Sequence, residues 1–359
     1  MANDNCRFEK EPLVSACIIA KNEEENLAGC LESGRDFWDE VVLVDTGSTD
    51  KTVEIAKAFG ARVLHEPWQD DFSQPRNTAL EAARGVFCHM IDCDERIVDT
   101  DLAETRHHLA NDALPSLLLV REQIRYPGGR QFTMIVPRIV KRSSGIRYLY
   151  PVHEQLDVKD ETGLLTNIRV THHGYESDEN LTRKETRNLR IAKSMPENHP
   201  HGLHCRARSA MALELWHEVE SAAATLVETE PSLLVAIEGC VLGGVANYQL
   251  RQLSKLEFYL RRGKEIAPDN PDILFLEFLT VGTKYAASFP AGDSFAPGDF
   301  MRPWLLWHDQ RQIELLLEVL AGKRRLLDEG ESQRQFLPGS ASADSQMSKL
   351  LTYKEEREL

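Results

Sequence analysis

The sequence predicts an α/β fold with a mostly parallel sheet, followed by a domain built from α-helices. In the first half of the 359-residue chain, short continuous apolar runs alternate with segments whose apolar residues recur at helical spacing. This alternation is typical of parallel sheets with right-handed crossovers. From about Leu181 only helical spacing remains. We therefore expect an N-terminal tail at 1–12, an α/β domain at 13–180, a helical domain at 181–329 and a flexible tail at 330–359.

Four apolar runs of the first half are predicted to be strands buried on both faces, because they are continuous rather than alternating. They are Leu13–Ala20, Glu40–Asp45, Ala61–Leu64 and Val86–Ile91. The segments between them have helical spacing, and two carry clear boundary signals. Gly60 is expected to stop a helix over Thr52–Phe59, and Pro75 lies in the first turn of a helix that runs from Ser73 to Gly85.

An antiparallel pair is expected after the parallel strands. Leu117–Arg125 and Gln131–Lys141 flank Pro127-Gly128-Gly129, as the two strands of a hairpin flank their turn. In the second half, Leu203–Glu228 and Leu250–Ile266 have helix-like spacing and each ends near a proline. The interval between these prolines is close to a tetratricopeptide unit of about 34 residues. The second half therefore resembles a degenerate tetratricopeptide pair.

Charge and composition exclude several classes of protein. The formal net charge is −15, which lacks the basic footprint of a general nucleic-acid binder and gives no broad attraction to anionic membranes. Apolar runs stay shorter than the roughly 18 residues of a transmembrane helix, and the N-terminus lacks the apolar core of a secretory signal. The seven cysteines form no CxxC pair, and Cys17, Cys30, Cys88 and Cys240 lie in apolar patterns. A cytoplasmic location is the expectation.

Acidic side chains follow two of the predicted parallel strands. Asp45 ends one strand, Asp92 and Asp94 come directly after another, and Asp70 and Asp71 lie in the loop before the Ser73 helix. Ligands of open α/β sheets bind outside the carboxyl ends of the strands. Each of these acids alone fits an ordinary loop, whereas several at one rim of one sheet favour a binding site.

The Asp92-Cys93-Asp94 turn presents two carboxylates that can face one hard cation. Mg²⁺ or Mn²⁺ prefers oxygen ligands and commonly bridges carboxylates to substrate phosphates. Such a cation would neutralise a departing diphosphate. The alternative is a solvated acidic turn without a ligand.

Other polar residues near the rim also have two interpretations. Asp45 could accept hydrogen bonds from a uracil or a ribose, while Asp50 could simply cap the following helix. Arg76 lies in the first turn of a helix, where an anion is favoured. It could grip a phosphate, pair with Asp71, or do both.

The order of these motifs resembles the family 2 glycosyltransferases, in particular the bacterial branch with SunS-type peptide glycosyltransferases and lipopolysaccharide-type enzymes. The matching stretches are Ser15–Glu24, Val44–Thr52, Asp71-Phe72-Ser73 with Arg76-Asn77, and Asp92-Cys93-Asp94-Glu95. Cys93 stands where the family usually has alanine. The resemblance covers about Leu13 to Tyr175. It implies a GT-A fold, a UDP- or other nucleotide-sugar donor and a divalent metal ion.

The resemblance also implies roles for individual residues. The expected nucleotide-sugar ligands are Lys21, Asn22, Glu23, Asp45, Asp71, Arg76 and Asp92. The expected metal ligands are Asp92, Asp94 and His172, the last from a Thr171–Tyr175 stretch that matches the branch. His172 could instead touch phosphate, or belong to an ordinary turn at a strand end.

The acceptor side rests on Val152-His153-Glu154, which resembles an element of the same branch. An inverting transferase needs a base that takes a proton from the attacking hydroxyl or thiol. Glu154 is the candidate base, with His153 as its orienting partner or as an alternative base; a carboxylate in an ordinary loop is the other interpretation. The basic run Lys184–Arg190 is either a solvated helix face or a segment that helps to close the donor site.

The sequence thus predicts metal-assisted, inverting transfer of a sugar from a nucleotide-sugar, with UDP as the expected nucleotide. The acceptor is a peptide or protein, or a glycan such as a lipid-linked sugar. The helical half would present the acceptor or a partner, since tetratricopeptide-like pairs form concave peptide-binding surfaces. One alternative is a non-catalytic scaffold that carries a degenerate transferase domain. A nucleotidyltransferase is a further alternative, but the expected glycine-rich loop is absent between Leu13 and Glu25.

Overall fold

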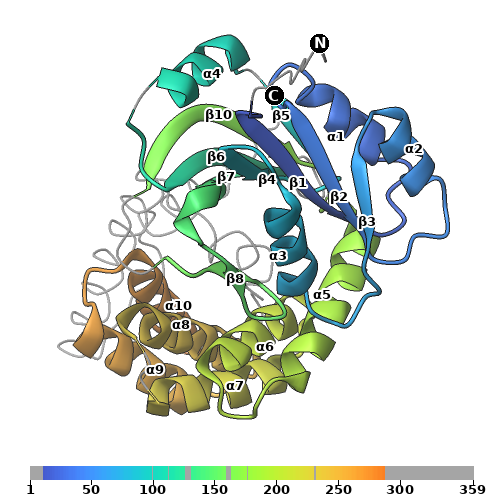
Figure 1. Ribbon diagram of the computed structural model, residues 1–359. Helices are drawn as coiled ribbons and strands as arrows, with labels where there is room; N and C mark the ends of the chain where they lie inside the picture. Colours follow the sequence, from blue (N-terminus) through green and yellow to red (C-terminus); the bar gives the residue numbers. More distant parts are fainter. Residues whose placement is uncertain are drawn as a thin grey trace, which may run out of the picture. The chain divides into compact units, whose positions relative to one another are not determined.

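The structure is a computed structural model that describes residues 11–98, 100–111, 113–125, 131–158, 163–175, 177–229 and 232–287. The chain divides into two compact units, Met1–Ala192 and Lys193–Leu359, which are described separately (Figure 1). Residues 1–10, the predicted turn at 127–129 and the predicted tail at 330–359 lie outside the described residues, as does the end of the predicted helical domain from 288 onward.

The first unit contains an eight-stranded sheet with the strand order β3-β2-β1-β4-β7-β6-β10-β5. The four predicted parallel strands are confirmed as β1 (Val14–Ala20), β2 (Glu40–Asp45), β3 (Arg62–His65) and β4 (Phe87–Met90). Strand β1 lies between β2 and β4, with Ala20 beside Asp45 and Cys17 beside Met90. The residues that follow β2 and β4 therefore emerge on either side of the end of β1.

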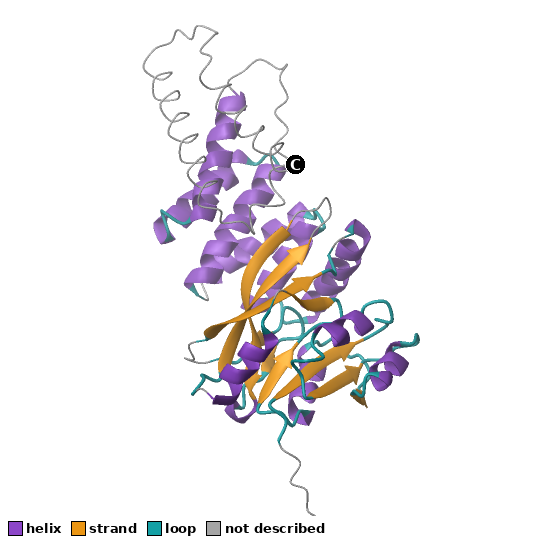
Figure 2. Ribbon diagram, turned by 90° about the horizontal axis from the view of Figure 1, so that it is seen from above, coloured by secondary structure: helices purple, strands orange, loops and turns teal. Residues whose placement is uncertain are grey.

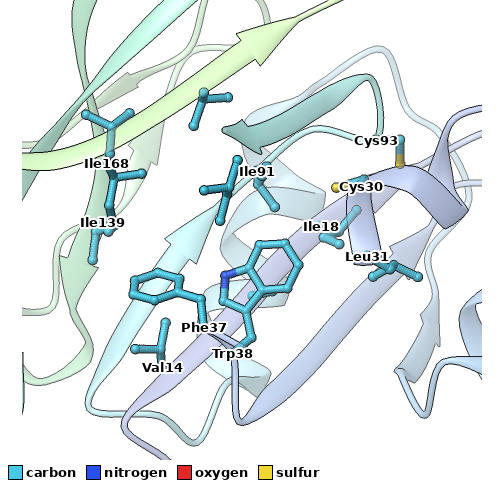
Figure 3. Close-up of a cluster of buried hydrophobic side chains, with 14 of the residues drawn as sticks. Val14, Ile18, Cys30, Leu31, Phe37, Trp38, Ile91, Cys93, Ile139 and Ile168 are labelled. Carbon is cyan, nitrogen blue, oxygen red and sulfur yellow. The ribbon is translucent and has the colours of Figure 1, made fainter. Parts of the chain in front are cut away.

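Helices cover both faces of this parallel half. Alternate residues of β1 point to opposite faces of the sheet and pack against different helices. Ile18 joins a buried cluster with α1 (Leu27–Ser33) and α2 (Thr52–Ala58), while Cys17 joins a second cluster with α3 (Ser73–Ala82). Phe37 and Trp38 fill the centre of the first cluster (Figure 3). The indole Nε1 of Trp38 donates a hydrogen bond of 3.1 Å to Nδ1 of the buried His89 imidazole.

The antiparallel pair is also confirmed, as β6 (Leu117–Arg125) and β7 (Gln131–Lys141). Strand β7 joins them to β4, and β10 (Leu164–His172) runs parallel to β6 on the other side. The edge strand β5 (Glu95–Val98) was not predicted, since it has only four residues and follows the acidic turn at once. Figure 2 shows these strands in orange. The sheet is therefore mixed and mostly parallel.

The remaining elements of the first unit surround the carboxyl rim or cover the sheet. Helix α4 (Leu102–Asn111) contributes Leu109 to the first buried cluster. A 3₁₀ turn at Arg142–Ser144 and a two-stranded sheet of β8 (Tyr148–Leu149) and β9 (Gln155–Leu156) follow β7. Helix α5 (Asp178–Ser194) then begins shortly after β10 ends at His172. Glu154 thus lies between β8 and β9, and α5 starts a few residues after the end of β10.

The described part of the second unit is helical. Its elements are α6 (Pro200–Ala212), α7 (Trp216–Thr229), α8 (Leu233–Gln249), α9 (Leu253–Ile266) and α10 (Pro271–Ala287), and each packs against the next. The segment Leu203–Glu228, which has helix-like spacing, is helical, but it is divided between two helices that meet at a turn where Glu214 has a φ of 59°. The apolar period continues through this turn, so spacing alone did not reveal it. The tetratricopeptide-like character stays a prediction.

The cysteine and membrane predictions can be compared with the same residues. Cys17, Cys30, Cys88 and Cys240 are buried and free, as expected for small core residues. Within the described part of the chain, none of the helices combines the length and apolarity that a membrane crossing requires. The cytoplasmic location stays a prediction.

Candidate active site

The acidic residues of the predicted site lie along one rim of the sheet. Asp45 pairs with Ala20 at the end of β1, and on the other side the Ile91 amide donates to the Cys17 carbonyl at 3.3 Å. The Asp92–Asp94 turn therefore continues from β4 next to the end of β1. Since neighbouring strands lie about 4.8 Å apart, roughly 10 Å separates the β2 and β4 chain positions across β1. The structure thus brings Asp45 and the Asp92–Asp94 turn to one edge.

The loops after β1 and β2 are joined by reciprocal hydrogen bonds. The Asn22 amide donates to the Ser48 hydroxyl at 3.0 Å, and the Asn22 side-chain oxygen accepts from the Thr49 amide at 2.8 Å. Asn22 adopts a left-handed conformation with a φ of 56° to make this connection. Its side chain therefore fixes the loop, while the neighbouring Lys21 is exposed at the rim.

Asp45 is held as an anion at the base of this double loop. Its carboxylate accepts a hydrogen bond of 3.0 Å from the Ser48 amide and lies 3.2 Å from His65 Nδ1. Burial opposes its charge, but the bonds from Ser48 and His65 outweigh burial and lower the pKa of Asp45. Burial raises the pKa of Glu23, and the negative charge of Asp94 adds to this rise. Glu23 is thus electrostatically coupled to the Asp92–Asp94 turn.

Two aspartates at the rim accept hydrogen bonds from the first residue of a helix. Asp50 accepts from the Thr52 amide and hydroxyl at the start of α2, and its other carboxylate oxygen accepts from the Glu24 amide at 3.1 Å. Asp71 accepts from the Ser73 amide at 2.7 Å and from the Ser73 hydroxyl at 2.6 Å at the start of α3. The side chain of Asp71 is thus engaged with its own helix, and its binding of a nucleotide-sugar stays a prediction.

Arg76 links the acidic turn to the predicted acceptor side. Its guanidinium is buried, with Nη2 2.9 Å from Asp92 Oδ1 and Nε 2.5 Å from Glu154 Oε1. Burial opposes the charge of Arg76, but these two carboxylates raise its pKa above the usual value. The expected pairing with Asp71 is not the one observed, because Asp71 faces the α3 backbone. Arg76 instead fixes Asp92 and Glu154 relative to one another.

Glu154 and His153 lie in the segment between β8 and β9. Glu154 Oε1 accepts the hydrogen bond from Arg76, while Oε2 has no hydrogen-bond partner among the residues that the structure describes. His153 has a φ of 48°, a left-handed conformation that is uncommon for residues other than glycine. The Phe72 amide also donates to the Pro151 carbonyl at 2.9 Å. This segment is thereby tied to the start of α3, which carries Arg76.

Asp94 and His172 form the second half of the rim. His172 Nε2 lies 3.3 Å from Asp94 Oδ1, and His172 Nδ1 lies 2.9 Å from Glu122 Oε1. Burial opposes protonation, but the two carboxylates raise the pKa of His172 to about 10. Lys184 Nζ contacts the other Asp94 oxygen, Oδ2, at 2.7 Å. Each carboxylate oxygen of Asp94 therefore faces a positively charged side chain.

Glu122 and Arg138 were missed by the sequence analysis. Leu118 and Leu119 pair with Ile139 and Pro137, so Arg138 is the extra residue of a β-bulge. A bulge re-aims a side chain, and here it turns Arg138 toward Glu95 at 2.5 Å and Glu122 at 2.9 Å. Glu122 had a usable signal, because it continues the inward-facing alternation of Leu118 and Val120.

Asp94 and His172 are suitable ligands for a divalent metal ion, and a side-chain cation already lies beside Asp94. Asp94 offers an oxygen ligand, and His172 would offer a nitrogen ligand 3.3 Å away once its imidazolium gives up a proton. The Lys184 ammonium already occupies a cation position at Asp94. Metal-ligating histidines usually donate their other ring nitrogen to a carboxylate, which is the relation of His172 to Glu122.

A second set is also close enough for a metal ion. Glu95, Glu122 and His172 each place a ligand atom within 4.8 Å of the others. The Arg138 guanidinium already bridges the two carboxylates of this set. We therefore assign Glu95, Glu122 and Arg138 to holding His172 in position, and not to binding the metal ion.

Comparison with known proteins identifies the family of this domain. The model of Glycosyl transferase family 2 matches residues 15–152. A TPR repeat-containing protein of Synechococcus elongatus is 36% identical over 144 residues, which are 40% of this chain and 35% of that protein. The prophage-derived glycosyltransferase SunS of Bacillus subtilis is 27% identical over 207 residues, which are 53% of this chain and 48% of that protein. The chain thus spans between about a third and a half of these relatives.

Among solved structures, S. aureus TarS 1–349 in complex with UDP-GlcNAc aligns with 80% of this chain and 95% of its own, at a TM-score of 0.42 and 16% identity. The mixed, mostly parallel sheet followed by helices agrees with the α/β fold class that the sequence predicted. Residues 15–152 of this chain therefore form a glycosyl transferase family 2 domain.

Proposed function

We propose that this chain is a glycosyltransferase that moves a sugar from a UDP-linked donor to a peptide, protein or glycan acceptor with inversion. The observation that carries the proposal is the rim itself. Asp45 lies on one side of β1, and Asp92, Asp94 and His172 lie on the other. The family 2 domain and the relative named as glycosyltransferase SunS support the same activity.

The donor would lie across the end of β1. Asp45, held as an anion by Ser48 and His65, accepts hydrogen bonds from the nucleoside. Asp94 and His172 would hold a divalent cation, Mg²⁺ or Mn²⁺, and this ion would supply Lewis-acid neutralisation of the diphosphate. Arg76 keeps Asp92 in place and contributes positive charge to the same region. A preorganised group of this kind stabilises the charge that develops on the leaving diphosphate.

The acceptor would be activated by Glu154. Its Oε2 is the oxygen that Arg76 does not bind, and it can take a proton from the attacking hydroxyl or thiol. The second unit consists of consecutive packed helices in its described part, a type of array that offers extended binding surfaces in repeat proteins. This supports a peptide or protein acceptor, or a partner that delivers a glycan.

The test of the activity is a donor screen by mass spectrometry. The full chain is incubated with Mn²⁺ and with UDP-, GDP- and TDP-sugars in turn, and the free nucleotide is measured. We expect release of UDP from at least one UDP-sugar, and loss of that release in EDTA. If no donor is consumed and neither UDP nor Mn²⁺ raises the melting temperature, the non-catalytic scaffold is favoured, because a ligand of the folded state must stabilise it.

The role of Glu154 is tested by Glu154→Gln. The glutamine oxygen can still accept from Arg76 Nε, so the local geometry is kept while the base is removed. We expect sugar transfer to fall by about 100-fold or more, since general base catalysis contributes about 10²–10⁴-fold. Retained transfer in the folded variant would rule out this base, and His153→Gln then tests the alternative base.

A further inference from the structure

Lys184 occupies a cation position inside the candidate metal site. Its Nζ lies 2.7 Å from Asp94 Oδ2, on the opposite carboxylate oxygen from His172. Both members of the pair are largely buried, so this contact is poorly screened by solvent. We propose that Lys184 is a built-in counter-ion of Asp94 that a divalent metal ion must displace in order to bind. This inference rests on the proposed metal-dependent activity and adds a residue that sets its metal requirement.

The chain leaves room for this contact at Gly174. A Cβ atom at this position would lie 2.0 Å from Asp94 Oδ2 and 2.2 Å from Lys184 Nζ. A side chain at this position would therefore require the ends of the Asp94 and Lys184 side chains to shift. The adjacent Tyr175 adds a favourable contact, since the Lys184 ammonium lies 4.5 Å from the centre of its ring. The segment after β10 thus leaves space for the contact between Lys184 and Asp94.

Helix α5 is fixed in this position by two other basic residues. Arg187 lies 4.6 Å from the centre of the Phe72 ring, and Arg190 donates to both oxygens of Asp70 at 2.5 and 2.7 Å. Together with Lys184, these residues follow one another at steps of three along α5. The helix is therefore anchored without Lys184. The long side chain of Lys184 can leave Asp94 while the helix stays in place.

Electrostatics gives the direction of the effect. Asp94 lies close to the carboxylates of Asp92 and Glu23. Its negative charge acts to raise the pKa of each of them. The Lys184 ammonium offsets part of this negative charge in the metal-free protein. A divalent ion that binds Asp94 would break the contact between Asp94 and Lys184. The Lys184 ammonium, which is also positively charged, would in addition repel the ion. Removal of the ammonium should therefore increase metal affinity.

The experiment is a Mn²⁺ titration of the full chain, followed by electron paramagnetic resonance of the free ion. Lys184→Met is expected to bind Mn²⁺ at least about tenfold more tightly than the original chain, since a neighbouring unit charge at such a distance alters binding by this factor or more. The matched control is Arg190→Met, which removes a basic residue of the same helix that contacts Asp70 instead of Asp94. Its affinity should equal that of the original chain.

A second readout is the melting temperature with and without Mn²⁺. In EDTA, Lys184→Met should melt below the original chain, and added Mn²⁺ should raise its melting temperature by more. Lys184→Ala provides the same comparison if the methionine variant fails to fold. Unchanged or weaker Mn²⁺ binding in the folded Lys184 variant would overturn the inference, as would unchanged Mn²⁺ binding in Asp94→Asn.

The two proposals fail in different measurements. If no donor releases its nucleotide but the Lys184 variant binds Mn²⁺ more tightly, the proposed transferase activity is wrong and the counter-ion role stands. If nucleotide is released in the presence of Mn²⁺ but the Lys184 variant shows no gain in affinity, the activity stands and the counter-ion role is wrong.

Discussion

Replacing Asp94 by asparagine is expected to lower metal-dependent release of UDP by at least about 100-fold, because loss of one preorganised electrostatic contact to the developing charge costs about this much. The asparagine side chain has nearly the same shape, but it cannot carry the charge that faces His172 and Lys184. The rate at saturating donor and saturating Mn²⁺ is the measurement.

Asp36→Asn is the control for this prediction, because Asp36 is an exposed carboxylate of the same unit, away from the rim. It should release UDP at the original rate. Circular dichroism and the melting temperature show whether each variant is folded. Turnover of folded Asp94→Asn within a factor of two of the original chain would contradict the assignment of Asp94 to the metal.

Arg138→Met is expected to destabilise the protein more than any other single substitution at the rim. Arg138 contacts the buried side chains of both Glu95 and Glu122. Burial raises the pKa of Glu95 to about 8, whereas Arg138 and His172 hold the pKa of Glu122 at about 2 despite its burial. Removing one partner of a buried ion pair typically costs about 3–5 kcal/mol, because it leaves an uncompensated charge. The free energy of unfolding in urea at pH 7 measures this loss.

Two further variants show whether the loss comes from the charges. Arg35→Met removes an exposed partner of Glu32, and exposed pairs contribute about 0–1 kcal/mol. The triple variant Arg138→Met with Glu95→Gln and Glu122→Gln should recover part of the stability, since it removes the unpaired negative charges. A loss below about 1 kcal/mol in Arg138→Met would mean that the bulge and its ion pairs contribute little to folding.

The sequence predicted the features of this domain that depend on local patterns. Strands buried on both faces appear as continuous apolar runs, so β1 to β4 could be located, and an acid at the end of such a strand could be assigned to the rim. The hairpin of β6 and β7 was equally clear from its turn residues. The edge strand β5 is too short and too polar to show a period.

The parts that could not be predicted depend on pairing between distant residues. Lys184 was noted as one member of a basic run, but its partner Asp94 lies 90 residues earlier in the chain. Arg138 reaches Glu95 only because a bulge shifts the register of β7, and single-sequence patterns do not specify bulges. The bonds from Ser73 to Asp71 at the start of α3 were not predicted, because the motif around Asp71 resembled a functional one.

Because Arg138 is the extra residue of a bulge, the number of residues in β7 determines whether Arg138 faces Glu95 and Glu122. Deleting one residue on either side of it would restore a regular ladder and rotate Arg138 to the far face of the sheet. Glu95 and Glu122 would then lose the guanidinium that contacts both of them, and His172 would face these two side chains without it. This strand should therefore accept many changes of side chain at its exposed positions but not a change in its number of residues.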